Sequence, residues 1–180
     1  MVLAGAQADY AEMFETADGN PIDVGDFVTF DGASDKIRKA NATDNYIIGV
    51  VSATLAIVAD ASDLRWDNLF VTDEWGRVQY REVVVSETED EEGNIVIPQF
   101  MKKEPILNPA YDPSKQYVSR MDRPEWVAVG VVGKLLVRDD GTCEVGGYCR
   151  PDDEGIATGV STGYRVKKRT GPNQIQIFVE

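Results

Sequence analysis

The chain has 180 residues, of which 43% are hydrophobic, and its formal net charge is -13. This length and apolar content suit one globular domain with a sizeable core and exclude a disordered chain. The negative charge argues against nucleic acid or an anionic membrane as a partner, and no run approaches the roughly 18 apolar residues of a membrane span. Histidine is absent, which excludes His-based catalytic triads and His-ligated metals, so we expect no metal or other cofactor.

The N-terminal segment is short and has no basic start, unlike a signal peptide. We interpret residues 1–8 as the end of a longer upstream chain and residues 9–180 as the domain itself. Directly after this boundary, Tyr10–Thr16 suits a short helix.

Asp9 and Glu12 place two carboxylates three residues apart. On a helical or turn-like backbone this spacing puts them on one face. There they can point into water, as acidic residues in a first helical turn do. Alternatively they can divide an acid and a base role, because close carboxylates shift their pKa values apart. Spacing alone leaves both interpretations open and favours the first.

The rest of the chain consists mostly of short runs rich in β-branched and aromatic residues, separated by turn signals such as Asp31-Gly32 and Glu92-Gly93-Asn94. A second short helix is predicted over Asp60–Asn68, with Ser62 as its cap. Gly130 and Gly133 interrupt the longest run and predict a bulge or bend. We therefore predict an all-β fold of bent strands with few short helices. The predicted strands are Phe27–Phe30, Ile47–Val51, Val78–Val84, Ile95–Ile97, Trp126–Val137, Tyr164–Lys168 and Ile175–Val179.

Three further features lie in the middle and last third of the chain. Met101–Arg123 contains three prolines and little apolar periodicity, so it is either a segment that wraps a neighbouring subunit or a surface loop. Cys143 and Cys149 bracket a predicted hairpin turn and suit two reduced thiols. The acidic stretches Asp139–Gly141 and Asp152–Gly155 lack the alternating ligand spacing of a calcium loop, so we expect solvated turns.

Nine segments carry a resemblance to a known family: Ala8–Glu15, Ala17–Pro21, Lys36–Ala40, Tyr46–Ser52, Thr72–Arg77, Asn108–Ser114, Arg123–Gly130, Gly133–Gly141 and Lys168–Gln174. They cover nearly the whole chain, and so many segments in order make the resemblance specific. The chain resembles the autoproteolytic intramolecular-chaperone domain at the C-terminus of bacteriophage tail spike and neck appendage proteins, a class of glutamic peptidase.

The resemblance implies that Asp9 and Glu12 are the catalytic residues and that the bond between Ala8 and Asp9 is cleaved. It also implies a homotrimer that folds with the upstream tail spike domains of the same chain in the host cytoplasm. The spike then belongs to the virion, and the chaperone domain is released. A site shared between subunits would make cleavage report correct assembly.

The chemistry of Asp9 agrees with such a role. Its side chain could attack the carbonyl carbon of Ala8 through a six-membered ring, and the chain itself supplies the proximity. A second route uses water as the nucleophile. In both routes Glu12 acts as general base, or as the acid that protonates the departing nitrogen of Asp9.

A peptide bond is inert without a donor that stabilises the oxyanion. The candidate donors are backbone amides and four basic side chains, among which the sequence does not choose: Lys36, Arg38, Lys39 and Arg123. Two rival functions involve no cleavage. One is a purely structural trimerisation module, and the other is a glycan-binding fibre tip that uses Trp66, Trp75 and Trp126 if they are exposed.

The acidic charge leads to a prediction about salt. Three chains of -13 would together carry -39, and this repulsion must be offset by apolar burial or by paired basic residues, for which Arg38, Lys39, Arg120 and Arg123 are candidates. We expect raised salt to strengthen the trimer, because it screens the repulsion. Sedimentation at increasing salt measures this, and dissociation by salt would show that interfacial ion pairs dominate.

Overall fold

The computed structural model describes residues 9–32, 34–61 and 68–180. It divides them into two compact units, one made of the described residues up to 61 together with 118–180, and the other of residues 68–117. Each unit is built from strands, which confirms the predicted all-β class. In the part of the chain that is described, no helix is long and apolar enough to cross a membrane.

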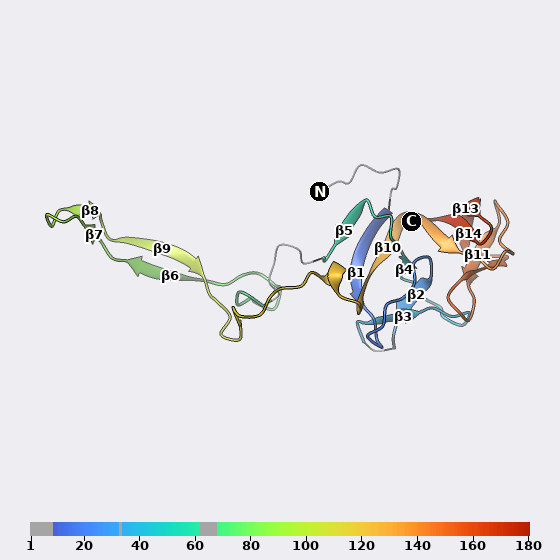
Figure 1. The fold of residues 1–180 in the computed structure, drawn as a ribbon, viewed down its shortest axis with the longest axis horizontal. Helices are drawn as coiled ribbons and strands as arrows, with labels where there is room; N and C mark the ends of the chain where they lie inside the picture. Colours follow the sequence, from blue (N-terminus) through green and yellow to red (C-terminus); the bar gives the residue numbers. More distant parts are fainter. Residues whose placement is uncertain (1–8, 33, 62–67) are drawn as a thin grey trace. The chain divides into compact units, whose positions relative to one another are not determined.

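The first unit contains one sheet whose main path runs β12-β11-β13-β14-β10-β4-β2-β3, with β1 paired to β10 and β5 (Figure 1). A single 3-10 turn, η1 (Arg120–Asp122), precedes β10. The strands are β1 (Asp9–Glu15), β2 (Phe27–Phe30), β3 (Ile37–Lys39), β4 (Gly49–Val51), β5 (Ile57–Ala59), β10 (Trp126–Arg138), β11 (Tyr148–Pro151), β12 (Ala157–Val160), β13 (Tyr164–Gly171) and β14 (Gln174–Val179).

The long strand β10 organises this sheet. Its first half pairs antiparallel with β1 and β4, and its second half pairs with β14. The register with β1 shifts between Tyr10 and Ala11, opposite Val132 and Gly130, which confirms the predicted bulge. Gly133 follows at a φ of 112°, a conformation that favours glycine.

The core consists of two clusters on opposite faces of the sheet. Neighbouring residues in a strand point to opposite faces, so β2 gives Phe27 to the first cluster and Val28 to the second. In β10, Val129 belongs to the second cluster, whereas Leu135 belongs to the first. The bulge adds one residue between them and thereby reverses the alternation. The first half of the strand therefore contributes to one cluster and the second half to the other, while Val132, Lys134 and Arg138 are exposed.

The second unit is a ribbon of two hairpins. β6 (Tyr80–Val85) pairs antiparallel with β9 (Phe100–Pro105), and β7 (Thr88–Glu89) pairs with β8 (Ile95–Ile97) at the ribbon's tip (Figure 1). None of the described residues 68–117 is fully buried. Two-stranded ribbons are marginally stable alone. The ribbon also exposes large apolar side chains, among them Tyr80, Val84, Ile95, Val96, Ile97, Phe100 and Met101.

All seven predicted strands are present, Phe27–Phe30 and Ile95–Ile97 with the predicted ends and the others with shifted ends. Three local predictions had a different outcome. Tyr10–Thr16 is not a helix: residues up to Glu15 belong to β1, and Thr16 forms an isolated bridge to Ile37. The predicted helix at Asp60–Asn68 falls largely outside the described residues, as does its cap, Ser62. The segment expected from Met101 onward begins inside β9 and is therefore paired at its start.

Gly49 provides a test of the close contact between β4 and β10. A Cβ atom at this position would lie 2.1 Å from the carbonyl oxygen of Gly130. We expect Gly49→Ala to lower the free energy of unfolding by about 1–3 kcal/mol or more, since 1–3 kcal/mol is the usual cost of overpacking. Gly171→Ala is the matched control, because its Cβ would meet only the Cβ of Gln174 at 3.5 Å. Equal unfolding midpoints in denaturant for the two variants would contradict the close approach.

Candidate functional site

The first site residues lie on a strand because β1 is paired on both sides. It runs antiparallel to β10 and parallel to β5. Asp9, Ala11 and Met13 are buried, which is the period-two burial of a strand. The segment contains alanine, methionine and glutamate, which are good helix formers. Pairing with two neighbouring strands outweighs that local preference.

This geometry corrects the prediction that Asp9 and Glu12 share a face. In a strand, residues three apart point to opposite faces. Asp9 faces inward with Ala11, whereas Glu12 lies on the other face with Tyr10. Along the strand the two positions are about 10 Å apart, at about 3.3 Å per residue. Within one chain, this arrangement does not bring the two carboxylates together. Ala8, the other residue of the expected cleavage site, lies outside the described residues.

The side chain of Asp9 is almost completely buried, with 2% of the residue exposed. Ser52 Oγ donates a hydrogen bond of 2.7 Å to Asp9 Oδ2. The other oxygen, Oδ1, is buried and has no hydrogen-bond partner among the described residues. Ser52 also lines an open pocket of about 290 Å³. Ser52 thus contacts both the buried carboxylate of Asp9 and this pocket.

Glu12 is half-buried and is held differently. The hydroxyl of Tyr10 donates to Glu12 Oε1 at 2.9 Å, on the exposed side of β1. This hydrogen bond raises the pKa of Tyr10, because loss of the tyrosine proton would remove the bond and place two negative charges together. Glu12 therefore has a defined orientation on the side of the strand away from Asp9.

The basic side chains considered as oxyanion donors already bind other groups of the same chain. Lys36 Nζ pairs with Glu15 Oε1 at 2.7 Å, at the end of β1 opposite Asp9, about 20 Å away at the rise of a strand. Arg123 donates to the carbonyl of Val118. Of the same set, Lys39 pairs with the buried carboxylate of Asp26 at 2.7 Å.

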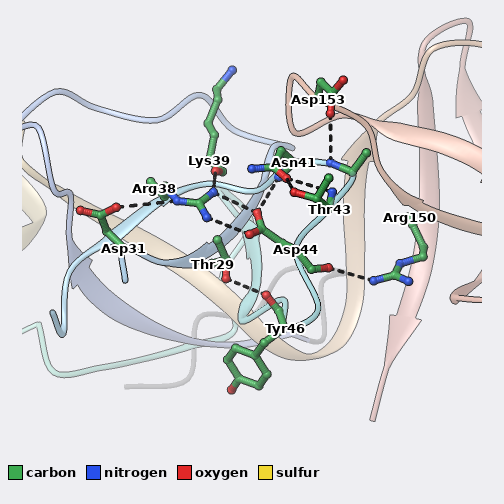
Figure 2. Close-up of polar contacts among 11 residues, drawn as sticks. Thr29, Asp31, Arg38, Lys39, Asn41, Thr43, Asp44, Tyr46, Arg150 and Asp153 are labelled. Atoms are coloured by element: carbon green, nitrogen blue, oxygen red, sulfur yellow. Dashed lines mark hydrogen bonds and ion pairs between the residues drawn. The ribbon is translucent and has the colours of Figure 1, made fainter. Parts of the chain in front are cut away.

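Arg38 belongs to a polar network around Asp44 (Figure 2). Its guanidinium donates to both carboxylate oxygens of Asp44, at 2.7 and 2.9 Å, and Asn41 N donates to the same carboxylate at 2.8 Å. Arg150, on β11, donates to the backbone carbonyl of Asp44 at 3.0 Å. These bonds fasten the loop after β3 to the sheet, which gives Arg38 a structural role.

The acidic turn at Asp139 differs from its prediction. Asp140 is exposed, but the side chain of Asp139 is fully buried and forms an ion pair with Arg169 of β13, so this turn is not simply solvated. Asp139, Asp140 and Cys143 lie close enough together to hold a metal ion. However, Asp139 is already ion-paired, and burial together with the nearby carboxylate raises the pKa of the Cys143 thiol, which opposes metal binding.

The two cysteines are free and buried. Burial raises the pKa of Cys149 to about 12, so it is an unreactive thiol. The predicted turn between them exists, with Gly147 N donating to Glu144 O at 2.9 Å. The residues before the turn are not in a strand. The residues after it form β11, which begins at Tyr148 and pairs with β12 and β13, so the two cysteines do not lie on paired arms of a hairpin.

Comparison with known proteins identifies the family. Residues 2–174 match the family described as Peptidase_G2, IMC autoproteolytic cleavage domain. The chain belongs to this family. Its relatives include the pre-neck appendage protein of Bacillus phage B103, which is 35% identical over 93% of this chain, and a phage-related protein, YobO, of Bacillus subtilis strain 168, which is 35% identical over 93% of it. This Peptidase_G2 chain covers 19% and 20% of those two proteins.

Two solved structures share the fold. The crystal structure of the pre-mature bacteriophage phi29 gene product 12 matches 98% of this chain with a TM-score of 0.79 and 31% identity, and the chain covers 22% of it. The C-terminal fragment of the same gene product matches 96% of this chain and is itself covered completely, with a TM-score of 0.75 and 32% identity. The Peptidase_G2 domain thus corresponds to a C-terminal part of a longer protein in that relative.

Three site features were missed by sequence reasoning. Ser52 lies within one of the segments that resemble the family, but nothing local indicates its contact with Asp9, 43 residues away in the sequence. The burial of Asp26 and Asp139 depends on basic residues from other strands, Lys39 and Arg169. Long-range pairing of this kind leaves no spacing signal in this Peptidase_G2 sequence.

The Asp44 network predicts a pH-dependent contribution to stability. The hydrogen bonds from Arg38 hold the pKa of Asp44 below its ordinary value near 3.8. A lowered pKa in the folded state means that this stabilisation is complete above the unfolded-state pKa and is lost as pH falls through the folded-state pKa. We expect Asp44→Asn to lower the free energy of unfolding at pH 7 by about 1 kcal/mol, allowing for the partial exposure of Arg38.

Urea unfolding at neutral pH and at about pH 3 measures this effect, and the difference between variant and wild type should shrink at the lower pH. Asp153→Asn is the control, because Asp153 is exposed and, among the described residues, its side chain accepts only a long hydrogen bond of 3.4 Å from Ala42 N. A difference that is independent of pH would show that the Asp44 charge is not responsible.

Proposed function

We propose that this chain is the C-terminal intramolecular-chaperone domain of a phage tail spike or neck appendage precursor. It drives assembly of a homotrimer and releases itself by cleaving the bond between Ala8 and Asp9. In this proposal residues 1–8 end the upstream spike chain, assembly occurs in the host cytoplasm, and the spike remains with the virion. The observation that carries the proposal is the buried Asp9 carboxylate with one unpartnered oxygen among the described residues, in a family of autoproteolytic domains.

The proposed reaction uses two carboxyl groups. An Asp9 oxygen attacks the carbonyl carbon of Ala8, a C–O bond forms, and the peptide C–N bond breaks as Glu12 transfers a proton to the nitrogen of Asp9. Water then hydrolyses the resulting anhydride, and the Glu12 carboxylate accepts the water's proton. The products are a free carboxyl group on Ala8 and a new N-terminus at Asp9. If water attacks directly, the same two groups supply the acid and the base.

The strand geometry of β1 supports a site shared between chains. Glu12 of the same chain is on the opposite face and about 10 Å along the strand. We therefore propose that Glu12 of a neighbouring chain serves Asp9 once the trimer has formed. The exposed apolar side chains of the β6–β9 ribbon support a trimer as well, because large exposed apolar surfaces are typical of contacts between proteins.

A glycan-binding tip has less support. Trp75 is 78% exposed, but Arg120 covers the ring of Trp126, with its guanidinium carbon 4.0 Å from the ring centre. Trp66 lies outside the described residues. An array of exposed indole rings, which a sugar platform would need, is thus not present among the described residues. The remaining rival is a trimerisation module that performs no chemistry.

The cleavage prediction is tested in a chain that carries its native upstream sequence. Glu12→Gln and Asp9→Asn should each abolish cleavage, because an amide keeps the shape but cannot exchange the required proton, and both variants should still form trimers. Intact-mass spectrometry should find wild-type protein cut between Ala8 and Asp9. Unchanged cleavage in either variant, or a cut elsewhere, would contradict the two-carboxylate mechanism.

Mixing the two variants tests whether the site is shared. In trimers that contain both, the Glu12→Gln chain keeps its own Asp9 and gains an intact Glu12 from its neighbour. We expect this chain to be cleaved and the Asp9→Asn chain to stay intact, with a mass tag on one chain to tell them apart. Absence of cleavage in mixed trimers, combined with activity of the wild type, would place both carboxylates in one chain.

A further inference from the structure

Ser52 connects the candidate site to the centre of the sheet. It follows directly after β4, and its backbone N–H donates to the carbonyl of Ala128 in β10 at 2.9 Å. Its Oγ reaches Asp9 Oδ2 at 2.7 Å. Since β10 also pairs with β1, one strand fixes both the donor and the acceptor of this hydrogen bond. The contact is therefore built into the fold.

A second contact leaves the proton of Ser52 available for Asp9. The backbone N–H of Thr54 donates to Ser52 Oγ at 3.3 Å, which uses an acceptor position of the hydroxyl and not its proton. A carboxylate can only accept, so the hydrogen bond between the two side chains is donated by Ser52 Oγ to Asp9 Oδ2.

The two oxygens of Asp9 have different surroundings, and among the described residues no basic group pairs with Asp9, in contrast to the buried Asp26 and Asp139. Asp44, a carboxylate with a structural role, accepts on both oxygens from Arg38. Asp9 accepts on Oδ2 alone, and Oδ1 is buried with no hydrogen-bond partner among the described residues. Burying an unpaired polar atom costs stability. Its presence in a native fold calls for an explanation.

We propose that Ser52 is a positioning residue for the self-cleavage: it holds Asp9 through Oδ2 and leaves Oδ1 as the oxygen that attacks the carbonyl carbon of Ala8. This inference rests on the proposed function. In the attack, Oδ1 forms the new C–O bond, the peptide C–N bond breaks, and the nitrogen of Asp9 takes the proton from Glu12. Ser52 keeps its proton throughout and acts only by fixing the rotamer of Asp9.

The test is a time course of cleavage in precursor made by cell-free synthesis with its native upstream sequence. After translation is stopped, the cleaved fraction of the trimer is followed by intact-mass spectrometry. We expect Ser52→Ala to slow cleavage about 10- to 100-fold, since a small misplacement of a reacting group has effects of that order. Ser52→Thr keeps the hydroxyl and should restore most of the rate, which a purely structural role would not require.

Thr29→Val is the matched control. Thr29 is a buried hydroxyl that donates to the carbonyl of Tyr46 at 2.6 Å, and its Oγ1 bond does not involve Asp9. The Thr29→Val variant should lower the unfolding temperature about as much as Ser52→Ala does, but its precursor should be cleaved at the wild-type rate. If Ser52→Ala does not assemble, Ser52→Cys supplies the comparison, because its thiol is only a weak donor.

The outcomes separate this inference from the function on which it rests. Cleavage of Asp9→Asn at the wild-type rate would overturn the proposed function itself. If Asp9→Asn blocks cleavage while Ser52→Ala cleaves normally, only the role of Ser52 is wrong. Equal slowing in Ser52→Ala and Ser52→Thr would also overturn it, because the retained hydroxyl of threonine should restore most of the rate.

Discussion

The antiparallel pairing of β1 with β10 determines where the chemical groups of this domain lie. It makes a strand of a segment whose composition suits a helix, and so turns Asp9 inward and Glu12 outward. The same strand β10 holds β4, and through β4 the hydroxyl of Ser52. The bulge in β10 lets this one strand contribute to two cores on opposite faces. β10 therefore positions both partners of the hydrogen bond between Ser52 and Asp9.

Two buried carboxylates of this acidic protein are neutralised by basic residues from other strands. Asp26 pairs with Lys39, and Asp139 pairs with Arg169. A buried carboxylate without a partner is costly, so these pairs are needed for the fold whatever their net contribution to stability. Each such pair removes one charge of each sign, so the excess of 31 acidic over 18 basic residues, a net charge of -13, remains. Apolar contact, such as the exposed ribbon can offer, then becomes the more effective way to hold like-charged chains together.

The sequence predicts the strands well where β-branched residues are dense, as in β2, β10 and β14, and it predicts the bulge from Gly130 and Gly133. It fails at β1, where alanine, methionine and glutamate suit a helix and only long-range pairing decides. The family resemblance identified Asp9 and Glu12 as candidates, but their placement on opposite faces follows from the strand. Ser52 and the buried Asp139 depend on contacts between residues far apart in the chain, which spacing within one sequence does not reveal.

An autoproteolytic domain faces a timing problem, because cleavage before assembly would separate the chaperone from the chain that it must fold. The geometry of β1 offers a physical solution in the mechanism proposed above. A strand cannot bring residues three apart to the same side, so a folded but unassembled chain has Asp9 without its acid partner. A peptide bond is stable under those conditions, since the departing nitrogen has no proton donor. In the proposed mechanism, assembly supplies that donor from a neighbouring chain, so that the reaction depends on the trimer without any separate regulatory device.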